Sequence, residues 1–298
     1  MIYCVFGLGN IGLLTSFFLR KENLFAISRR ASECRETRMR IYFLSSGEES
    51  FSLNICSLET SVRCDVAIFS SKAYEVKDYI MGFKGRFDEA YCLQNGYGVW
   101  EEVKPYSTLN KAFPAPVTYG VKTRNGEIVV TGEGVYYLGG FRGEEPVHLD
   151  SLAKALINGG ARVQVVNDVE PYVWQKLLVN SVTNPLTAVL KVPNGYLLKN
   201  KYLWKIAEEV IREVTDVARR EGITFPEDPV IFVKRVLEAT SSNYSSMLQD
   251  VMRGRKTEIE YINGFIIRKA SEHGVNVPFN LILYYLVKSL ENIISEVA

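Results

Sequence analysis

Short apolar runs alternate with longer amphipathic stretches along the first half of the chain. Strands are expected at residues 2–6, 24–28, 65–70 and 90–93, and helices after Asn10 and Ala73. This alternation favours a parallel sheet with helices on its faces. Further on, residues 117–138 combine β-branched segments with the turns Arg124-Asn125-Gly126 and Gly132-Glu133-Gly134. That stretch predicts antiparallel hairpins added to the sheet, which should end near Val166.

The second half of the chain has a helical pattern with few strand signals. Long runs begin near Val169, Leu203, Val230, Lys256 and Phe279. The prolines of Pro226-Glu227-Asp228-Pro229 fall between two of these runs and mark a turn. We therefore expect an α/β domain at residues 1–167, followed by an all-helical domain at residues 168–298.

A glycine pattern follows the first expected strand. The segment Gly7-Leu8-Gly9-Asn10-Ile11-Gly12 separates that strand from a helical run, which is the context of a dinucleotide-binding loop in a Rossmann-type domain. Glycine is needed for a tight turn at Gly7, for close approach of a pyrophosphate at Gly9 and for helix packing at Gly12. The helix N-terminus would face the phosphates with free N–H groups. Alternatively, the turn could bind nothing.

The end of the second strand indicates which nicotinamide cofactor is preferred. The run there is Ser28-Arg29-Arg30, and the first carboxylate after it is Glu33. Two guanidinium groups beside a hydroxyl suit a 2′-phosphate, so the run favours NADPH, with NADH as the alternative. One or both arginines could instead belong to a solvated turn.

One face of the helix expected after Val169 is polar. At 100° per residue, a sector of about 100° collects these side chains: Lys176, Asn180, Thr183, Asn184 and Thr187. Most of the remaining circumference is apolar, so this helix should be largely buried and its polar groups need partners. A ligand with a carbonyl and hydroxyls would satisfy them, and burial would bring the pKa of Lys176 toward neutrality, as suits proton transfer. The face could instead pack against another helix, or Lys176 could extend to solvent. Pro185 should kink the helix and free a carbonyl.

A second polar group lies downstream. Asn243, Ser245 and Ser246 precede an apolar run and could cap a helix. Glu258 and Glu260 are two residues apart on an expected helix, so they cannot both face one site.

Composition narrows the class of partner. The 298 residues carry 35 basic and 34 acidic side chains, a net charge of +1, which gives no electrostatic footprint for nucleic acid. Cys4, Cys34, Cys56, Cys64 and Cys92 are widely spaced and odd in number, so we expect reduced thiols. With neither a leader nor an apolar run long enough to cross a membrane, we expect a cytoplasmic protein. The two histidines are too isolated for a metal site.

The chain resembles the ketopantoate reductase (2-dehydropantoate 2-reductase) family from end to end. Besides the glycine loop, the matching segments are Lys72-Ala73, Gln94-Asn95-Gly96, Trp174-x-Lys176 with Asn180, Asn184-Pro185-Leu186-Thr187-Ala188, Pro193-Asn194-Gly195, Ser245-Ser246-Met247-x-Gln249-Asp250 and Thr257-Glu258-Ile259-Glu260-Tyr261-Ile262-Asn263-Gly264. Leu8 and Asn10 depart from the family, which usually has alanine at both positions.

The resemblance implies NADPH-dependent reduction of 2-dehydropantoate to (R)-pantoate, a step toward pantothenate and coenzyme A, in a cleft between the two domains. It places the general acid at Lys176 and a second catalytic residue, which helps to hold the substrate, at Glu258. The substrate-binding residues it implies are Asn95, Asn180, Asn184, Asn194, Asn243 and Ser246, although the turn at Asn194 has a local explanation as well. Lys72 and Asn95 would also border the cofactor.

Two other functions compete with this interpretation. A reductase of the same superfamily could act on another 2-keto acid or an opine-type substrate, although buried asparagines favour a hydroxylated one. A non-catalytic NADPH sensor would need neither Lys176 nor Glu258. The apolar helix expected at residues 279–297 could be core or the interface of a homodimer.

Overall fold

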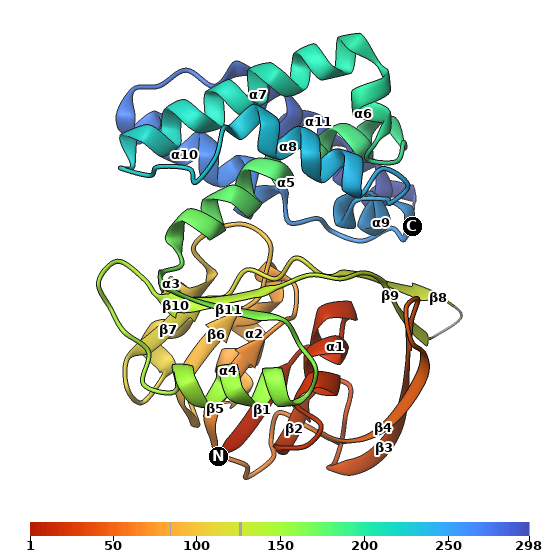
Figure 1. Cartoon of the computed structure of the whole chain (residues 1–298), viewed down its shortest axis with the longest axis vertical. Helices are drawn as coiled ribbons and strands as arrows, with labels where there is room; N and C mark the ends of the chain where they lie inside the picture. Colours follow the sequence, from red (N-terminus) through yellow and green to blue (C-terminus); the bar gives the residue numbers. More distant parts are fainter. Residues whose placement is uncertain (84, 125–126, 298) are drawn as a thin grey trace. The chain divides into compact units, whose positions relative to one another are not determined.

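The computed structural model describes residues 1–83, 85–124 and 127–297, and the chain forms two compact units (Figure 1). The first unit comprises Met1–Gln94 and Gly98–Glu170. The second unit begins at Pro171 and also includes the short loop Asn95–Tyr97. Residues 125 and 126 of one expected turn lie outside the described residues.

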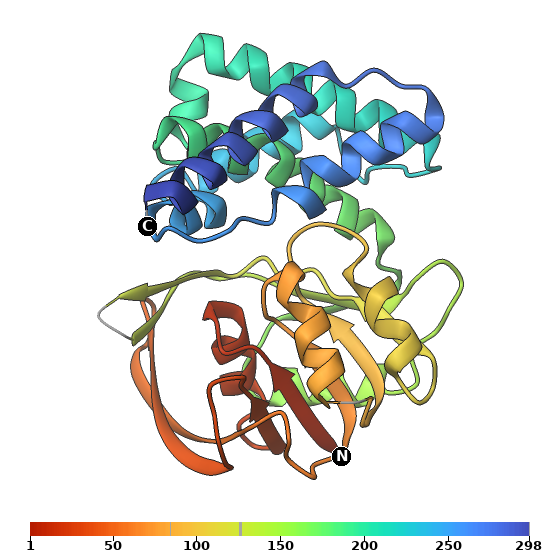
Figure 2. The ribbon, with the colours of Figure 1, turned by 180° about the vertical axis from the view of Figure 1, so that it is seen from behind.

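The first unit is an α/β structure. Its strands are β1 (Ile2–Phe6), β2 (Asn23–Ile27), β3 (Arg35–Phe43), β4 (Gly47–Cys56), β5 (Cys64–Phe69), β6 (Phe87–Cys92), β7 (Lys111–Pro114), β8 (Gly120–Arg124), β9 (Glu127–Gly132), β10 (Tyr136–Gly140) and β11 (Val163–Asp168). Its helices are α1 (Asn10–Phe18), α2 (Val76–Phe83), α3 (Val99–Val103), α4 (Leu149–Asn158) and the 3-10 turns η1 (Ala73–Glu75) and η2 (Lys104–Tyr106). Helices α1 and α4 lie on one face of the sheet, and α2 and α3 lie on the other (Figures 1 and 2).

Strand order places a switch point beside the glycine loop. Over the described residues the main sheet has the order β7-β6-β5-β1-β2-β4-β3-β9-β8, and β1 pairs in parallel with both β2 and β5. The chain therefore runs outward from β1 in two directions. In open parallel sheets, ligands bind at such a reversal, outside the carboxyl ends of the strands. The α/β fold class with parallel strands is confirmed.

Two details of the sheet differ from expectation. The long hairpin of β3 and β4 was not expected from the sequence, although Met39, Ile41 and Phe43 on β3 alternate with exposed side chains. The antiparallel pair β8 and β9 confirms one expected hairpin. The second expected hairpin, at the turn Gly132-Glu133-Gly134, is not formed. Strand β10, which follows this turn, pairs instead in parallel with β11 in a separate two-stranded sheet.

Four cysteines are paired, which corrects the expectation of reduced thiols. Cys4 forms a disulfide with Cys64, and Cys34 forms one with Cys56. Cys92 is a free, buried thiol. The sheet brings Cys4 and Cys64 together on the neighbouring strands β1 and β5, which sequence spacing does not reveal.

The second unit is helical. Its helices are α5 (Glu170–Leu190, the first residue belonging to the first unit), α6 (Tyr196–Lys199), α7 (Lys201–Arg220), α8 (Pro229–Ala239), α9 (Ser246–Met252), the 3-10 turn η3 (Ile259–Tyr261), α10 (Asn263–His273) and α11 (Pro278–Val297). Helices α7, α10 and α11 pack against one another, and α11 runs along this unit in Figure 2. The run expected to start near Lys256 begins as a helix only at Asn263.

Helix α5 forms the centre of this unit. Most of its apolar side chains are buried, as the sequence pattern predicts. The buried ones include Val173, Trp174, Leu177, Leu178, Val182, Leu186 and Ala188. Polar groups on such a helix must find partners inside the protein or on a ligand.

Candidate active site

The glycine loop has the backbone geometry that its three glycines predict. Gly7 has φ 91°, and a Cβ there would lie 2.5 Å from the backbone nitrogen of Ser71. A Cβ on Gly12 would lie 2.0 Å from the carbonyl oxygen of Gly7. A Cβ on Gly9 would meet no atom within 4 Å, and Gly9 is exposed. The fold thus requires Gly7 and Gly12, whereas the space beside Gly9 is open to a ligand at the N-terminus of α1.

Leu8 and Asn10, where the family usually has alanine, leave the space beside Gly9 open. The side chain of Asn10 is bonded to strand β8, donating to the carbonyl of Val121 (3.2 Å) and accepting from the hydroxyl of Thr123 (2.6 Å). Leu8 and Ile11 are half-buried. The amide of Asn10 therefore anchors the start of α1 to the β8–β9 hairpin.

The two arginines after β2 have different surroundings. Arg29 forms ion pairs with Glu75 and with Asp78, the latter at 2.7 Å. Arg30 is exposed, and among the described residues its guanidinium has no recorded partner. Arg30 is therefore the better placed of the two to receive a phosphate group.

Cys56 holds both ends of the loop, residues 28–34, that carries Arg29 and Arg30. The backbone nitrogen of Ser28 donates to the carbonyl of Cys56 (2.9 Å), and Cys34 is joined to Cys56 by the disulfide. After β5, the backbone nitrogen of Lys72 donates to the side chain of Glu75 (3.2 Å) at the start of η1. Cys56 thus closes the loop of residues 28–34 at the carboxyl end of β4.

The polar face of α5 leaves hydrogen-bonding atoms unused. Among the described residues, Nδ2 of Asn180, Oγ1 of Thr183 and Nδ2 of Asn184 are buried and have no hydrogen-bond partner. Burial lowers the pKa of Lys176 to about 8, although the negative charge of Glu258 acts in the opposite direction. Lys176 is half-buried, and its amine loses its proton near pH 8 one turn from amides that still need partners. Such an amine is suited to bind and protonate a carbonyl compound.

Glu258 is joined to a residue far away in the sequence. The residue is 4% exposed, and its carboxylate accepts a hydrogen bond from Nδ2 of Asn95 (3.2 Å), across a separation of 163 residues. Asn95 is held there because the backbone nitrogen of Tyr97 donates to the carbonyl of Tyr261 (2.9 Å). By contrast, Glu260 pairs with Arg268 (2.9 Å) and accepts from the hydroxyl of Tyr284 (2.6 Å). The two glutamates therefore have separate surroundings, as their spacing predicts.

Two of the hydroxyl groups singled out in the sequence have structural roles. Ser245 caps α9 by accepting from the backbone nitrogen of Leu248 (3.1 Å). Thr187 donates to Ser245 (2.7 Å) and so joins α5 to α9. Ser246 is half-buried at the first position of α9, and its hydroxyl has no recorded partner among the described residues.

Asn194 and Asn243 come together through their main chains. The backbone nitrogen of Asn194 donates to the carbonyl of Asn243 (2.9 Å), and its side chain donates to Thr240 (3.1 Å). Asn194 thus links the segment after α5 to the end of α8. These contacts give Asn194 a structural role, but they join distant segments and differ from the local need of its turn.

Pro185 lies inside α5 and frees the carbonyl of Ser181, as the sequence predicts. Nδ2 of Asn263 donates a hydrogen bond to that carbonyl (3.0 Å). Asn263 belongs to one of the segments that match the family, and no role for it was expected from the sequence. The signal was present, because a proline inside a buried helix requires a donor for the carbonyl four residues earlier.

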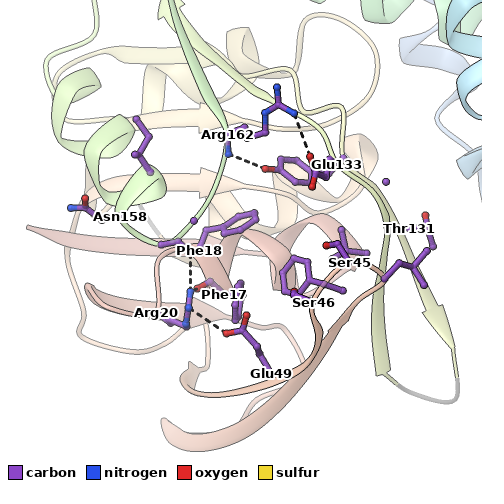
Figure 3. A pocket seen from close by; sticks show the side chains of 18 of the residues that line it. Phe17, Phe18, Arg20, Ser45, Ser46, Glu49, Thr131, Glu133, Asn158 and Arg162 are labelled. Atoms are coloured by element: carbon purple, nitrogen blue, oxygen red, sulfur yellow. Dashed lines mark hydrogen bonds and ion pairs between the residues drawn. The ribbon is translucent and has the colours of Figure 1, made fainter.

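A cavity in the first unit lies elsewhere. It has a volume of about 660 Å³ and is lined by the end of α1, the β3–β4 turn, β9 and the end of α4 (Figure 3). Its charged side chains are already engaged: Arg20 lies 3.6 Å from Glu49, and Arg162 lies 3.4 Å from Glu133. None of the residues predicted for the cofactor or substrate lines it.

Two kinds of feature are absent from the part of the chain that the structure describes. The described residues contain no group of three or more histidine, cysteine or acidic side chains that could hold a metal ion. None of their helices combines the length and apolar character needed to cross a membrane.

The chain is similar to proteins of one family over nearly its whole length. A model described as Ketopantoate reductase PanE/ApbA matches residues 3–143, and one described as its C-terminal part matches residues 168–291. The 2-dehydropantoate 2-reductase of Pyrobaculum aerophilum is 36% identical, covering 97% of this chain and 98% of the relative. That of Archaeoglobus fulgidus is 32% identical, covering 93% and 89%.

Solved structures share the fold. The PanE/ApbA family ketopantoate reductase from Ralstonia eutropha has a TM-score of 0.86 at 23% identity, covering 99% of this chain and 100% of that one. D-mandelate dehydrogenase, solved with NADH and anilino(oxo)acetate, has a TM-score of 0.84 at 21% identity with the same coverage. A dimeric ketopantoate reductase from Staphylococcus aureus has a TM-score of 0.83 at 18% identity, again covering 99% and 100%.

Proposed function

The chain belongs to the ketopantoate reductase family, and we propose that it reduces 2-dehydropantoate to (R)-pantoate with NADPH. The observation that carries this proposal is the polar face of α5, where Lys176 has a pKa of about 8 beside buried amides without partners. A plain structural role would leave these groups unsatisfied at a cost in stability.

The first unit would hold the cofactor. The open space beside Gly9 fits a pyrophosphate, which the N-terminus of α1 would stabilise through its free N–H groups. The guanidinium of Arg30 would pair with the 2′-phosphate, while Arg29 supports the same loop through its two carboxylate partners. Ser28, Lys72 and Asn95 complete the proposed cofactor contacts. When bound, NADPH supplies the hydride that reduces the keto carbon.

The second unit would bind and protonate the substrate. Lys176 in its ammonium form would donate a proton to the keto oxygen as that oxygen becomes an alcohol. Nδ2 of Asn180 and Nδ2 of Asn184 would donate to the substrate's oxygens, which satisfies atoms that the fold leaves unpaired. Glu258 would hold the substrate hydroxyl and keep Lys176 protonated at neutral pH.

The remaining predicted contacts are proposed at the edge of this group. Ser246 has a hydroxyl that the fold does not use and would bind the substrate. Asn243 would line the pocket. Asn194 would contribute indirectly, because its side chain already donates to Thr240.

The test is NADPH oxidation followed by absorbance with 2-dehydropantoate. NADH and a panel of other 2-keto acids run in parallel, including the keto acid that corresponds to mandelate. We expect turnover with 2-dehydropantoate and NADPH. Lys176→Ala should abolish turnover while leaving NADPH binding nearly intact, and unchanged activity in that variant would refute its role. NADPH binding with no turnover on any keto acid would instead support a sensor.

We further propose that the protein is a homodimer that pairs through α11. Its exposed apolar side chains recur at helical spacing: Ile282 (56% exposed), Tyr285 (59%), Leu286 (43%) and Ile293 (56%). Light scattering after size exclusion should give twice the chain mass for the wild type and a monomer for Leu286→Glu. A monomeric wild type would exclude this assembly.

A further inference from the structure

Four helices of the second unit are joined by buried hydrogen bonds that end at the carbonyl freed by Pro185. Glu213 on α7, Asn280 on α11 and Asn263 on α10 are 3%, 0% and 0% exposed. Glu213 accepts from Nδ2 of Asn280 (2.8 Å), Oδ1 of Asn280 accepts from Asn263 (2.9 Å), and Asn263 donates onward to Ser181 (3.0 Å). We call Glu213, Asn280 and Asn263 the buried relay.

The direction of every bond in the buried relay follows from its first member. A carboxylate only accepts, so the amide nitrogen of Asn280 must face Glu213 and its amide oxygen must face Asn263. Asn263 must then present its nitrogen, whose two hydrogens serve Asn280 and Ser181. Glu213 is held in turn by the backbone nitrogens of Phe279 and Asn280 at the start of α11, both at 2.9 Å.

The carbonyl at the end of the buried relay lies in the part of α5 that would bind the substrate. Ser181 follows Asn180 directly and precedes Asn184 by three residues, so the bond from Asn263 acts on the turn that carries both amides. Without a donor from residue 185, that turn has lost one of its own helical bonds. A bond from a neighbouring helix takes its place and ties the turn to α10.

We propose that Asn263 is a positioning residue for the substrate: through the Ser181 carbonyl it sets the placement of Asn180 and Asn184. This inference rests on the proposed function of that face. It assigns to Asn263 an effect on substrate affinity in addition to its effect on stability. Small displacements of binding groups are costly in enzymes because affinity depends on their exact spacing.

The test is a double-mutant cycle between Asn263→Asp and Pro185→Ala. Asn263→Asp keeps the size of the side chain and removes at least one of its two donors, because a carboxyl group has one O–H when protonated and none when ionised. We expect the Michaelis constant for the keto acid to rise about tenfold, with kcat changed much less, and the midpoint of thermal unfolding to fall by roughly 2–6 °C. Pro185→Ala restores an N–H for the Ser181 carbonyl, so in that background both effects of Asn263→Asp should shrink by more than half. Asn276→Asp, at an exposed position on the loop after α10, is the matched control and should change neither.

The outcomes separate the possible failures. Equal effects of Asn263→Asp in both backgrounds would overturn the link through Ser181. Coupled unfolding with an unchanged Michaelis constant would overturn the positioning role. If the wild type reduces another keto acid, the same cycle is measured with that acid. The positioning role of Asn263 is then tested even though the proposed substrate is wrong. If the wild type reduces no keto acid, the proposed function and the positioning role are both refuted. The unfolding midpoints of the same variants still test whether Asn263 and Pro185 are coupled through the Ser181 carbonyl.

Discussion

The rate of reduction should depend on pH through Lys176, in a way that Glu258 controls. With a pKa of about 8, Lys176 is protonated in about nine-tenths of molecules at pH 7 and about one-tenth at pH 9. As the proton donor it acts in the protonated form. We therefore expect kcat/KM to be nearly constant below pH 7 and to fall about tenfold for each pH unit above 8.

Replacing Glu258 by glutamine tests the cause of that pKa. The Glu258 charge raises the pKa of Lys176 against the effect of burial, so its removal should lower the pKa further, by about one unit. The alkaline limb of the profile then moves to lower pH. Glutamine still offers an oxygen to Asn95, so the hydrogen bond that joins the two segments can persist.

The assay is the initial rate of NADPH oxidation between pH 6 and 10 at constant ionic strength. Glu260→Gln is the matched control, because Glu260 pairs with Arg268 and Tyr284 and has no recorded interaction with Lys176. Its profile should coincide with that of the wild type. An alkaline limb that stays in place in Glu258→Gln, or that moves to higher pH, would refute the assignment of this limb to Lys176.

Unfolding provides a second measurement of the same pKa. Because the folded protein lowers the pKa of Lys176 from 10.5 to about 8, the charged amine destabilises the fold. This penalty is complete below pH 8 and is relieved as pH rises from 8 toward 10.5, where the unfolded chain retains the proton longer. Lys176→Met should therefore raise the free energy of unfolding by about 3 kcal/mol at pH 7, a gain that disappears by about pH 10.5. Denaturant titrations of both proteins at these two pH values measure the gain. A loss of unfolding free energy in Lys176→Met at pH 7 would contradict the lowered pKa of Lys176.

The remaining predictions concern the cofactor unit. Gly9→Ala should leave the unfolding midpoint unchanged and weaken NADPH binding more than tenfold, whereas Gly12→Ala should lower the midpoint by several degrees; fluorescence titration and calorimetry distinguish them. Arg30→Ala should raise the Michaelis constant for NADPH about tenfold without affecting NADH, and Arg29→Ala should affect it less. Cys34→Ser should weaken NADPH binding by loosening the arginine loop, and dithiothreitol should do the same to the wild type but not to this variant.

Local chemistry made part of this structure predictable. The roles of Gly7 and Gly12 follow from the geometry of a strand–turn–helix, and the polar face of α5 follows from helical periodicity. Pairing between distant segments was not accessible in the same way. Neither the disulfide of Cys4 with Cys64 nor the bond of Asn95 with Glu258 leaves a mark in sequence spacing, because each depends on which strands and loops the fold brings together.

The polar residues of the helical unit fall into two groups: those whose hydrogen-bond partners the fold supplies and those whose partners it does not. The sequence alone does not distinguish the two groups. Thr187, Ser245 and Glu260 have theirs within the unit, so their substitution should cost stability first. Asn180 and Asn184 retain buried donors without partners, so their substitution should cost substrate affinity first. In a buried helix, an unsatisfied donor lowers stability unless a ligand completes it. That two such donors lie on the face of α5 that carries Lys176 is the strongest physical reason to place the substrate there.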